Sequence, residues 1–86
     1  MSLRIIWTEP ALDDWAKLDR QVARQVDRAL TRLAETGQGD LSRLQPPLVG
    51  YHLRVRDWRV FLGLDRAAGT ITVRGVEHRS RAYKRR

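Results

Sequence analysis

The chain has 86 residues, of which 42% are hydrophobic, with a net charge of +7 and no cysteine. We therefore expect a single domain over residues 1–86 that folds in a reducing cytoplasm without disulfides or thiolate metal sites. Its apolar runs are far shorter than the roughly 20 residues of a membrane span. Arg4 interrupts the N-terminal apolar stretch, which argues against a secretory leader. The excess of positive charge favours a polyanionic partner.

The first half of the chain predicts a strand followed by two helices. Residues 3–7 are β-branched and aromatic, as is typical of a short strand. Thr8 is a suitable N-cap for a short helix with Pro10 in its first turn. Asp19 can cap a second helix, which Gly37 ends. Apolar residues recur at helical spacing in both segments, so we expect an antiparallel helical hairpin.

The second half predicts a loop and then a three-stranded antiparallel meander. Prolines and glycines punctuate a loop at residues 38–50. Alternating apolar residues predict three strands, at residues 51–56, 58–65 and 70–77. Asp57 and Gly69 mark the turns between them, and the tail from residue 78 is expected to be irregular or briefly helical. The order β-α-α-β-β-β predicts an α+β fold with one mixed or antiparallel sheet packed against the helices.

Alternation assigns two faces to this sheet. The apolar positions should pack against the helices: Leu53, Val55, Val60, Leu62, Ile71 and Val73. The opposite face should carry His52, Arg54, Arg56, Arg59, Phe61 and Arg74. Basic side chains around an aromatic ring suit RNA, whose phosphates and bases they can bind and stack on. The alternative is a solvated sheet face, although such a face normally mixes charges of both signs.

The net positive charge lies in the second half of the chain. Residues 1–47 contain seven basic and seven acidic residues, whereas residues 48–86 contain ten basic and three acidic ones, so the whole +7 lies there. Arginine accounts for 15 of the 17 basic residues, and its planar guanidinium binds phosphate through paired hydrogen bonds. A coding bias that enriches arginine on any surface explains this segregation poorly.

Two motifs resemble the RelE/ParE superfamily of toxins. Residues 51–61, YHLRVRDWRVF, resemble its strand pair Y-x-L-R-V-G-D-Y-R-V-x-Y, and residues 76–83, VEHRSRAY, resemble its terminal V-G-H-R-x-x-x-Y. The resemblance implies a RelE-like, microbial-RNase-like fold and the toxin role in a type II toxin–antitoxin system. It further implies a cognate antitoxin. For RelE-like members it implies cleavage of messenger RNA in the ribosomal A site, with no cofactor.

The resemblance assigns candidate residues one position at a time. The catalytic candidates that it assigns are His52, Arg54, Arg59, Arg79 and Tyr83. The RNA-binding candidates come from the basic sheet face and the basic tail: Arg56, Phe61, Arg74, Arg81 and Lys84. The sequence departs from the family in three places. Arg56 and Glu77 stand where many members have glycine, and His52 replaces a lysine seen in some. Glu77 places a carboxylate near the expected substrate path.

RelE-like cleavage implies attack of a ribose 2′-OH on the adjacent phosphate. Arg54, Arg59 and Arg79 are expected to bind the charge of the transition state. His52 is expected to accept the proton, with a pKa lowered by neighbouring arginines, and Tyr83 to stack on a base or orient the 2′-OH. The sequence has no metal-binding motif, and no conventional acid–base pair is visible. His52 as an exposed strand histidine and Tyr83 as a tail anchor remain alternatives.

Other polar and aromatic residues have structural interpretations. Asp13 and Asp14 are interpreted as a charge pair near a helix N-terminus, and His78 as a residue that positions the tail. Trp7 and Trp15 stand at core spacing, while Trp58 packs or borders the groove.

Three functions compete. The first is a ribosome-dependent mRNA-cleaving toxin, the second a ParE-like inhibitor of DNA gyrase without RNase activity, and the third a catalytically inactive nucleic-acid-binding domain. The arginines and Tyr83 separate the first from the others.

Overall fold

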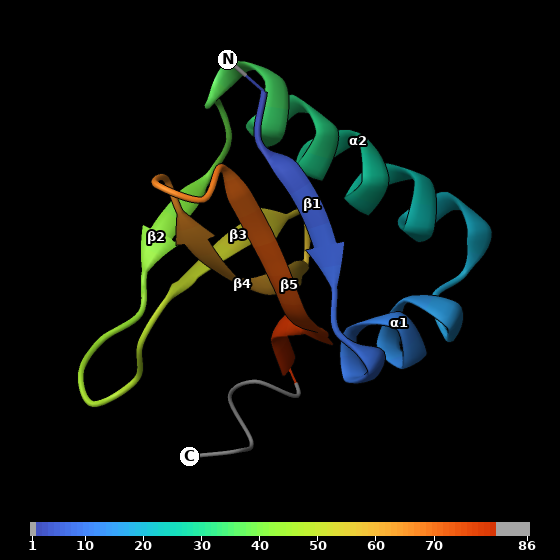
Figure 1. Cartoon of the computed structure of the whole chain (residues 1–86). Helices are drawn as coiled ribbons and strands as arrows, with labels where there is room; N and C mark the ends of the chain where they lie inside the picture. The colour runs from blue at the N-terminus through green and yellow to red at the C-terminus, as the bar shows by residue number, and fades with distance from the viewer. Residues whose placement is uncertain (1, 81–86) are drawn as a thin grey trace.

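The computed structural model describes residues 2–80, in which two helices pack on one side of a twisted sheet (Figure 1). In chain order the elements are β1 (Arg4–Trp7), α1 (Glu9–Ala16), α2 (Arg20–Thr36), β2 (Leu41–Arg43), β3 (Tyr51–Val55), β4 (Trp58–Asp65) and β5 (Thr70–His78). The sheet has five strands in the order β1-β5-β4-β3-β2. β1 runs parallel to β5, and the other neighbours are antiparallel, so the sheet is mixed.

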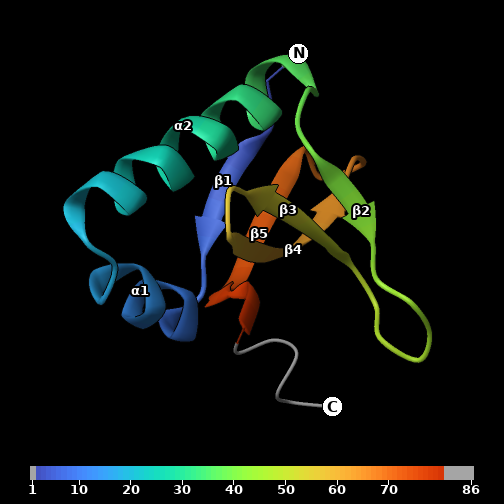
Figure 2. The same ribbon diagram turned by 180° about the vertical axis from the view of Figure 1, so that it is seen from behind.

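The predicted three-stranded antiparallel meander is confirmed as β3, β4 and β5, but a fourth strand after the helices was missed. The additional strand, β2, lies inside the segment expected to be a loop and pairs with β3, with Leu41 opposite Leu53. A strand of three residues is too short to show alternation in the sequence. Its pairing with β3 therefore fixes its conformation. In Figures 1 and 2 the chain between β2 and β3 projects away from the body of the molecule.

The predicted helix ends are confirmed. The Thr8 hydroxyl accepts a hydrogen bond from the Ala11 amide and donates one to the Val73 carbonyl, which joins the start of α1 to β5. The Asp19 carboxylate caps α2 by accepting from the Gln21 amide at 2.8 Å. Gly37 ends α2 with φ of 76°, a conformation that glycine adopts without a steric penalty.

The two helices are linked by a short turn and one side-chain hydrogen bond. The Trp15 indole donates to the Asp27 carboxylate at 3.0 Å. The chain reverses direction after α1, and Figure 1 shows the helices diverging from the turn as a V. Neither helix within residues 2–80 is long and apolar enough to cross a membrane.

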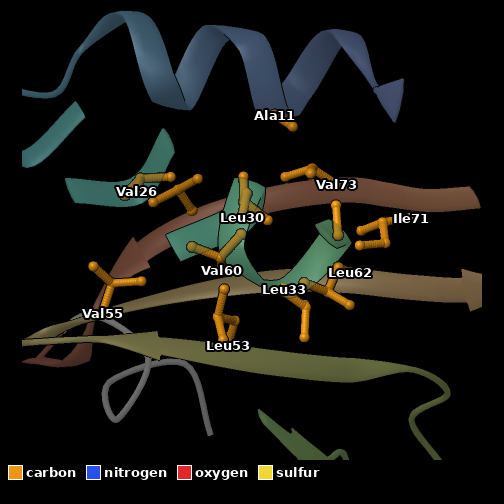
Figure 3. Close-up of a cluster of buried hydrophobic side chains, with 12 residues drawn as sticks. Ala11, Val26, Leu30, Leu33, Leu53, Val55, Val60, Leu62, Ile71 and Val73 are labelled. Carbon is orange, nitrogen blue, oxygen red and sulfur yellow. The ribbon is translucent and has the colours of Figure 1, made fainter. Parts of the chain in front are cut away.

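The core lies between α2 and the sheet (Figure 3). The six sheet residues predicted to be buried are all at most 8% exposed: Leu53, Val55, Val60, Leu62, Ile71 and Val73. Val26, Leu30 and Leu33 of α2 pack against them. Trp7 and Trp15 border this core with their rings edge to face, at a centroid distance of 6.3 Å, which confirms their packing role.

A β-bulge interrupts the pairing of β4 with β5. Phe61 pairs with Gly75 and Leu62 pairs with Val73, so Arg74 is the extra residue on β5. A bulge of this kind redirects a side chain and increases the local twist. Beyond the bulge, the Val76 amide donates to the Asp14 carboxylate at 3.0 Å.

The interpretation of Asp13 and Asp14 as a charge pair near a helix N-terminus was wrong. Because α1 begins at Glu9, Asp13 and Asp14 lie beyond its first turn. Asp14 instead ties α1 to β5.

Candidate functional site

The sheet face away from the helices carries the predicted basic residues in two cross-strand pairs. His52 lies opposite Phe61, with their rings 6.4 Å apart and close to edge to face. Arg54 lies directly opposite Arg59. Like charges placed opposite each other destabilise a sheet, so this arrangement has a cost in folding free energy. A bound anion between the two guanidinium groups would remove it.

A groove of about 1040 Å³ crosses this face. Four strands contribute most of its polar and aromatic side chains: Ser42, Arg43, His52, Arg59, Phe61, Arg74 and Glu77. Asp14 of α1 and Gln45 of the loop after β2 also line it. Leu44, Leu48 and Val76 add apolar surface. The groove therefore offers cationic groups for phosphates and apolar surface for bases, which is the combination that single-stranded RNA requires.

A smaller depression of about 120 Å³ adjoins the groove at Arg59, which lines both. The other basic residues around it are Arg54, Arg56 and Arg79. The Arg79 guanidinium lies 3.7 Å from the Asp57 carboxylate, and the Arg79 amide donates to the Asp57 carbonyl at 2.7 Å. These contacts hold the start of the C-terminal segment against the β3–β4 turn.

The pKa of His52 is lowered from its ordinary value, in the direction expected. Burial is the main cause, and the positive charges of Arg59 and Arg54 add to it, while Asp40 acts in the opposite sense. The sequence prediction attributed the shift to the arginines alone. A neutral imidazole at physiological pH can accept a proton.

The structure brings all the described candidates to these two hollows. The groove holds His52, Arg59, Phe61 and Arg74, and the depression holds Arg54, Arg56, Arg79 and again Arg59. The remaining candidates, Arg81, Tyr83 and Lys84, lie outside residues 2–80.

His78 and Trp58 have the structural roles expected of them. His78 Nδ1 lies 2.9 Å from the Ser80 hydroxyl, at the start of the tail. The Trp58 and His78 rings meet edge to face at 5.1 Å, and Trp58 both packs against the core and lines the depression.

Two residues of the groove were missed or undervalued in the sequence. Arg43 was placed in a loop, but it belongs to β2 and donates to the Tyr51 hydroxyl at 3.3 Å. The hydrogen bond and the charge of Arg43 lower the pKa of that hydroxyl. Glu77 lies opposite Arg59 in the β4–β5 ladder, so a phosphate must compete with a nearby carboxylate for this guanidinium. The family motif had already indicated a carboxylate near the substrate path at Glu77, and the structure adds its position opposite Arg59.

Among residues 2–80, no three His, Asp or Glu side chains come together in a set that could hold a metal ion.

Solved structures of RelE-type proteins share this fold. A chain of the toxin–antitoxin complex RelBE2 from Mycobacterium tuberculosis has a TM-score of 0.81 and 22% identity, and the match covers 92% of this chain and all of that one. A chain of the archaeal RelE–RelB complex from Pyrococcus horikoshii has a TM-score of 0.78 and 18% identity, with 94% and 99% covered. The isolated Escherichia coli RelE toxin has a TM-score of 0.68 and 22% identity, with 98% of each chain covered. These similarities define a RelE-like fold.

The sequence itself matches a family model. No curated protein sequence matches the chain, but the model described as the ParE toxin of type II toxin–antitoxin systems, parDE, matches residues 5–83. The chain therefore belongs to the RelE/ParE superfamily of toxins from type II toxin–antitoxin systems. The resemblance identified from its strand and terminal motifs is confirmed.

Proposed function

We propose that this toxin is a ribosome-dependent endoribonuclease that cleaves messenger RNA. The observation that carries the proposal is the set of cationic groups around Arg59. Arg54 lies opposite it, His52 lines the same groove, and Arg79 lines the same depression. A gyrase-binding surface has no need for a partly buried neutral imidazole among arginines, whereas phosphodiester cleavage needs both a proton acceptor and cations.

The cleavage proceeds by attack of the ribose 2′-oxygen on the adjacent phosphorus, with release of the 5′-oxygen. His52 takes the 2′-OH proton as the new P–O bond forms. Arg54, Arg59 and Arg79 bind the non-bridging oxygens, on which negative charge accumulates. The products are a 2′,3′-cyclic phosphate and a 5′-OH, which takes up one proton. The ribosome positions the messenger. This positioning lowers the activation barrier of cleavage without requiring a further catalytic group on this chain.

Primer extension on a reporter messenger in a reconstituted translation system tests the proposal. The wild-type protein should produce cuts only when ribosomes are present. Arg79→Ala should reduce them about 10²-fold or more, the usual effect of removing a charge-stabilising group. Arg28→Ala, which removes an exposed arginine from α2, should cut like the wild type. Intact messenger in the wild-type reaction would contradict the proposal.

Inhibition of DNA gyrase is the second candidate, because the matching family model is that of ParE toxins. In this case the basic face binds a protein or a protein–DNA complex and catalyses nothing. A supercoiling assay with purified gyrase distinguishes the two functions. Inhibition by both the wild type and Arg79→Ala, together with intact messenger, would support the gyrase function.

We also propose a cognate antitoxin as partner. Two of the similar structures are RelE–RelB or RelBE2 complexes by their own descriptions. β1 and β2 are the edge strands of the sheet, and a partner can add a strand to such an edge or cover the basic face. Co-expression with the product of the adjacent gene should restore growth and yield a complex by affinity purification. Continued growth arrest without a complex would exclude that gene product as the partner.

A further inference from the structure

Arg74 is held in place by a bulge in its own strand, a close approach to a glycine and a hydrogen bond to a loop. It is the extra residue of the β-bulge, which redirects its side chain. Its guanidinium lies over Gly63, where an added Cβ would come within 2.9 Å of Nη2 and 3.3 Å of Cζ. An added Cβ at Gly50 would lie 3.4 Å from Nη1. Gly63 thus leaves the space that this guanidinium occupies, and Gly50 lies in ordinary contact with it.

The Arg74 guanidinium also connects the sheet to the loop between β2 and β3. Nη1 donates to the Val49 carbonyl at 3.3 Å. One hydrogen bond leaves most of its five donors available to a ligand, and the residue is exposed. The side chain is therefore positioned before a ligand arrives, which reduces the entropic cost of binding.

Arg74 separates the groove from a second hollow of about 570 Å³. The polar side chains around this hollow are Tyr51, Asp65, Arg66, Thr70, Thr72 and Arg74. The Asp65 carboxylate accepts from the Ala68 amide within the β4–β5 turn. The hollow therefore presents two arginines and three hydroxyl groups, all of which can donate to phosphate oxygens.

The second hollow is too far from Arg59 to bind the same phosphate. Gly63, beneath the Arg74 guanidinium, lies four residues beyond Arg59 on β4. At about 3.4 Å per residue, the backbone positions of Arg59 and Gly63 are roughly 14 Å apart along the strand, several times the span of a phosphate group. A chain of phosphates could contact both arginines, passing Phe61 on the way.

We propose that Arg74 and the second hollow form a distal phosphate-binding subsite for single-stranded RNA, separate from the centre around Arg59. This subsite rests on the proposed function, since it extends the path of the same substrate. It holds the backbone of the RNA away from the bond that is cut. The enzyme would then bind a segment of several nucleotides, and its affinity would depend on the length of the RNA.

Fluorescence anisotropy with labelled, 2′-O-methylated single-stranded RNA of about three and about nine nucleotides tests this subsite. The wild type should bind the longer RNA more tightly. Arg74→Ala should weaken binding of the longer RNA about 3- to 10-fold and leave the shorter one unchanged. It should also reduce the slope of log affinity against log salt by about 0.7, the loss expected for one phosphate contact on a single strand.

Gly63→Ala provides a variant with unchanged net charge. Its methyl group would displace the Arg74 guanidinium, which is the movable end of a flexible side chain, so it should reproduce the effect of Arg74→Ala on the longer RNA. Arg28→Ala removes the same charge from the exposed face of α2 and should bind both RNAs like the wild type. Thermal unfolding of each variant establishes that it is folded.

The outcomes separate the subsite from the proposed function. If the wild type binds neither RNA, the subsite fails, whereas the proposed function is decided by the ribosome-dependent primer-extension assay. If it prefers the longer RNA but Arg74→Ala and Gly63→Ala behave like Arg28→Ala, only the subsite fails. Equal loss of affinity for both lengths would place Arg74 at the centre around Arg59 and overturn a separate subsite.

Discussion

At the scale of single residues, His52 combines burial with neighbouring positive charge. Both lower its pKa, so the imidazole is neutral at pH 7 in the folded chain. In the unfolded chain the pKa returns to about 6.5. The unfolded state therefore binds more protons as the pH falls below that value, and the chain loses stability from there down through the folded pKa. At any pH above its folded pKa, His52 is unprotonated and can still accept a proton.

Replacement of Asp40 tests this assignment without touching the proposed catalytic groups. Asp40 raises the pKa of His52, so Asp40→Asn should lower it further and extend the pH range of cleavage toward acid. NMR titration of the His52 imidazole in the wild type and in Asp40→Asn measures the shift directly. A His52 midpoint at or above the ordinary value of 6.5 in the wild type would contradict the assignment.

Arg56 is the second residue with an informative conformation. It has φ of 57°, the only positive value of a non-glycine residue within residues 2–80, in the turn between β3 and β4. A side chain in this region costs about 1 kcal/mol or more. This is the position at which many family members have glycine. The conformation explains why glycine suits the turn.

Arg56→Gly should therefore stabilise the protein. We expect the free energy of unfolding to rise by about 1 kcal/mol and Tm by roughly 5 °C, measured by thermal denaturation. Arg66→Gly is the matched control, because Arg66 lies in the β4–β5 turn without a positive φ, and glycine there should be neutral or destabilising. If the two variants had the same effect, relief of backbone strain could not be the cause.

At the scale of elements, the bulge in β5 and the first helix depend on each other. The Asp14 carboxylate accepts a hydrogen bond from the Val76 amide, close to the bulge. An added Cβ at Gly75 would lie 3.3 Å from the same carboxylate. α1 therefore supplies an acceptor for a β5 backbone amide two residues beyond the bulge. The position of Arg74 depends on this local geometry.

Asp14→Ala should destabilise the protein by about 1–3 kcal/mol, because the partly buried Val76 amide would lose its acceptor. Asp13→Ala, one residue away and exposed, should change the free energy of unfolding by less than about 0.5 kcal/mol. Urea denaturation of both variants measures the difference. Similar values for the two would mean that water replaces the Asp14 carboxylate at no cost.

At the scale of the whole molecule, the charge is divided between the two layers. The helices lie within residues 1–47, whose charges sum to zero, while β3, β4 and β5 lie within residues 48–80, which hold six basic and three acidic residues and so carry a net +3. The face away from the helices thus has a positive potential that attracts polyanions. The opposed pair Arg54 and Arg59 concentrates that potential at one point.

Binding to single-stranded RNA should accordingly depend steeply on salt. If Arg54, Arg59, Arg74 and Arg79 each contact a phosphate, the slope of log affinity against log salt should be about −3. The affinity should then fall about 50-fold between roughly 50 and 200 mM salt, measured by anisotropy on the longer RNA. An affinity that is flat over this range would contradict the basic-face interpretation.

The sequence by itself determined both helices and their ends, the three longest strands of the second half and the buried face of the sheet. These features depend on local causes. Thr8, Asp19 and Gly37 satisfy the backbone at helix ends, and strict alternation decides which side chains face the core. The family resemblance also needed only the sequence, because its residues are close together in two short segments.

Only the tertiary structure decided the remaining features. β2 exists because β3 pairs with it, and the pairing partner lies ten residues away. The bulge at Arg74 depends on the register of two strands, and the link from Asp14 to Val76 spans 62 positions. Burial, which the sequence does not measure, sets the pKa of His52 more than its arginine neighbours do. Each of these features arises from contacts between segments that are far apart in the chain. Alternation and spacing describe each segment separately and so do not predict such contacts.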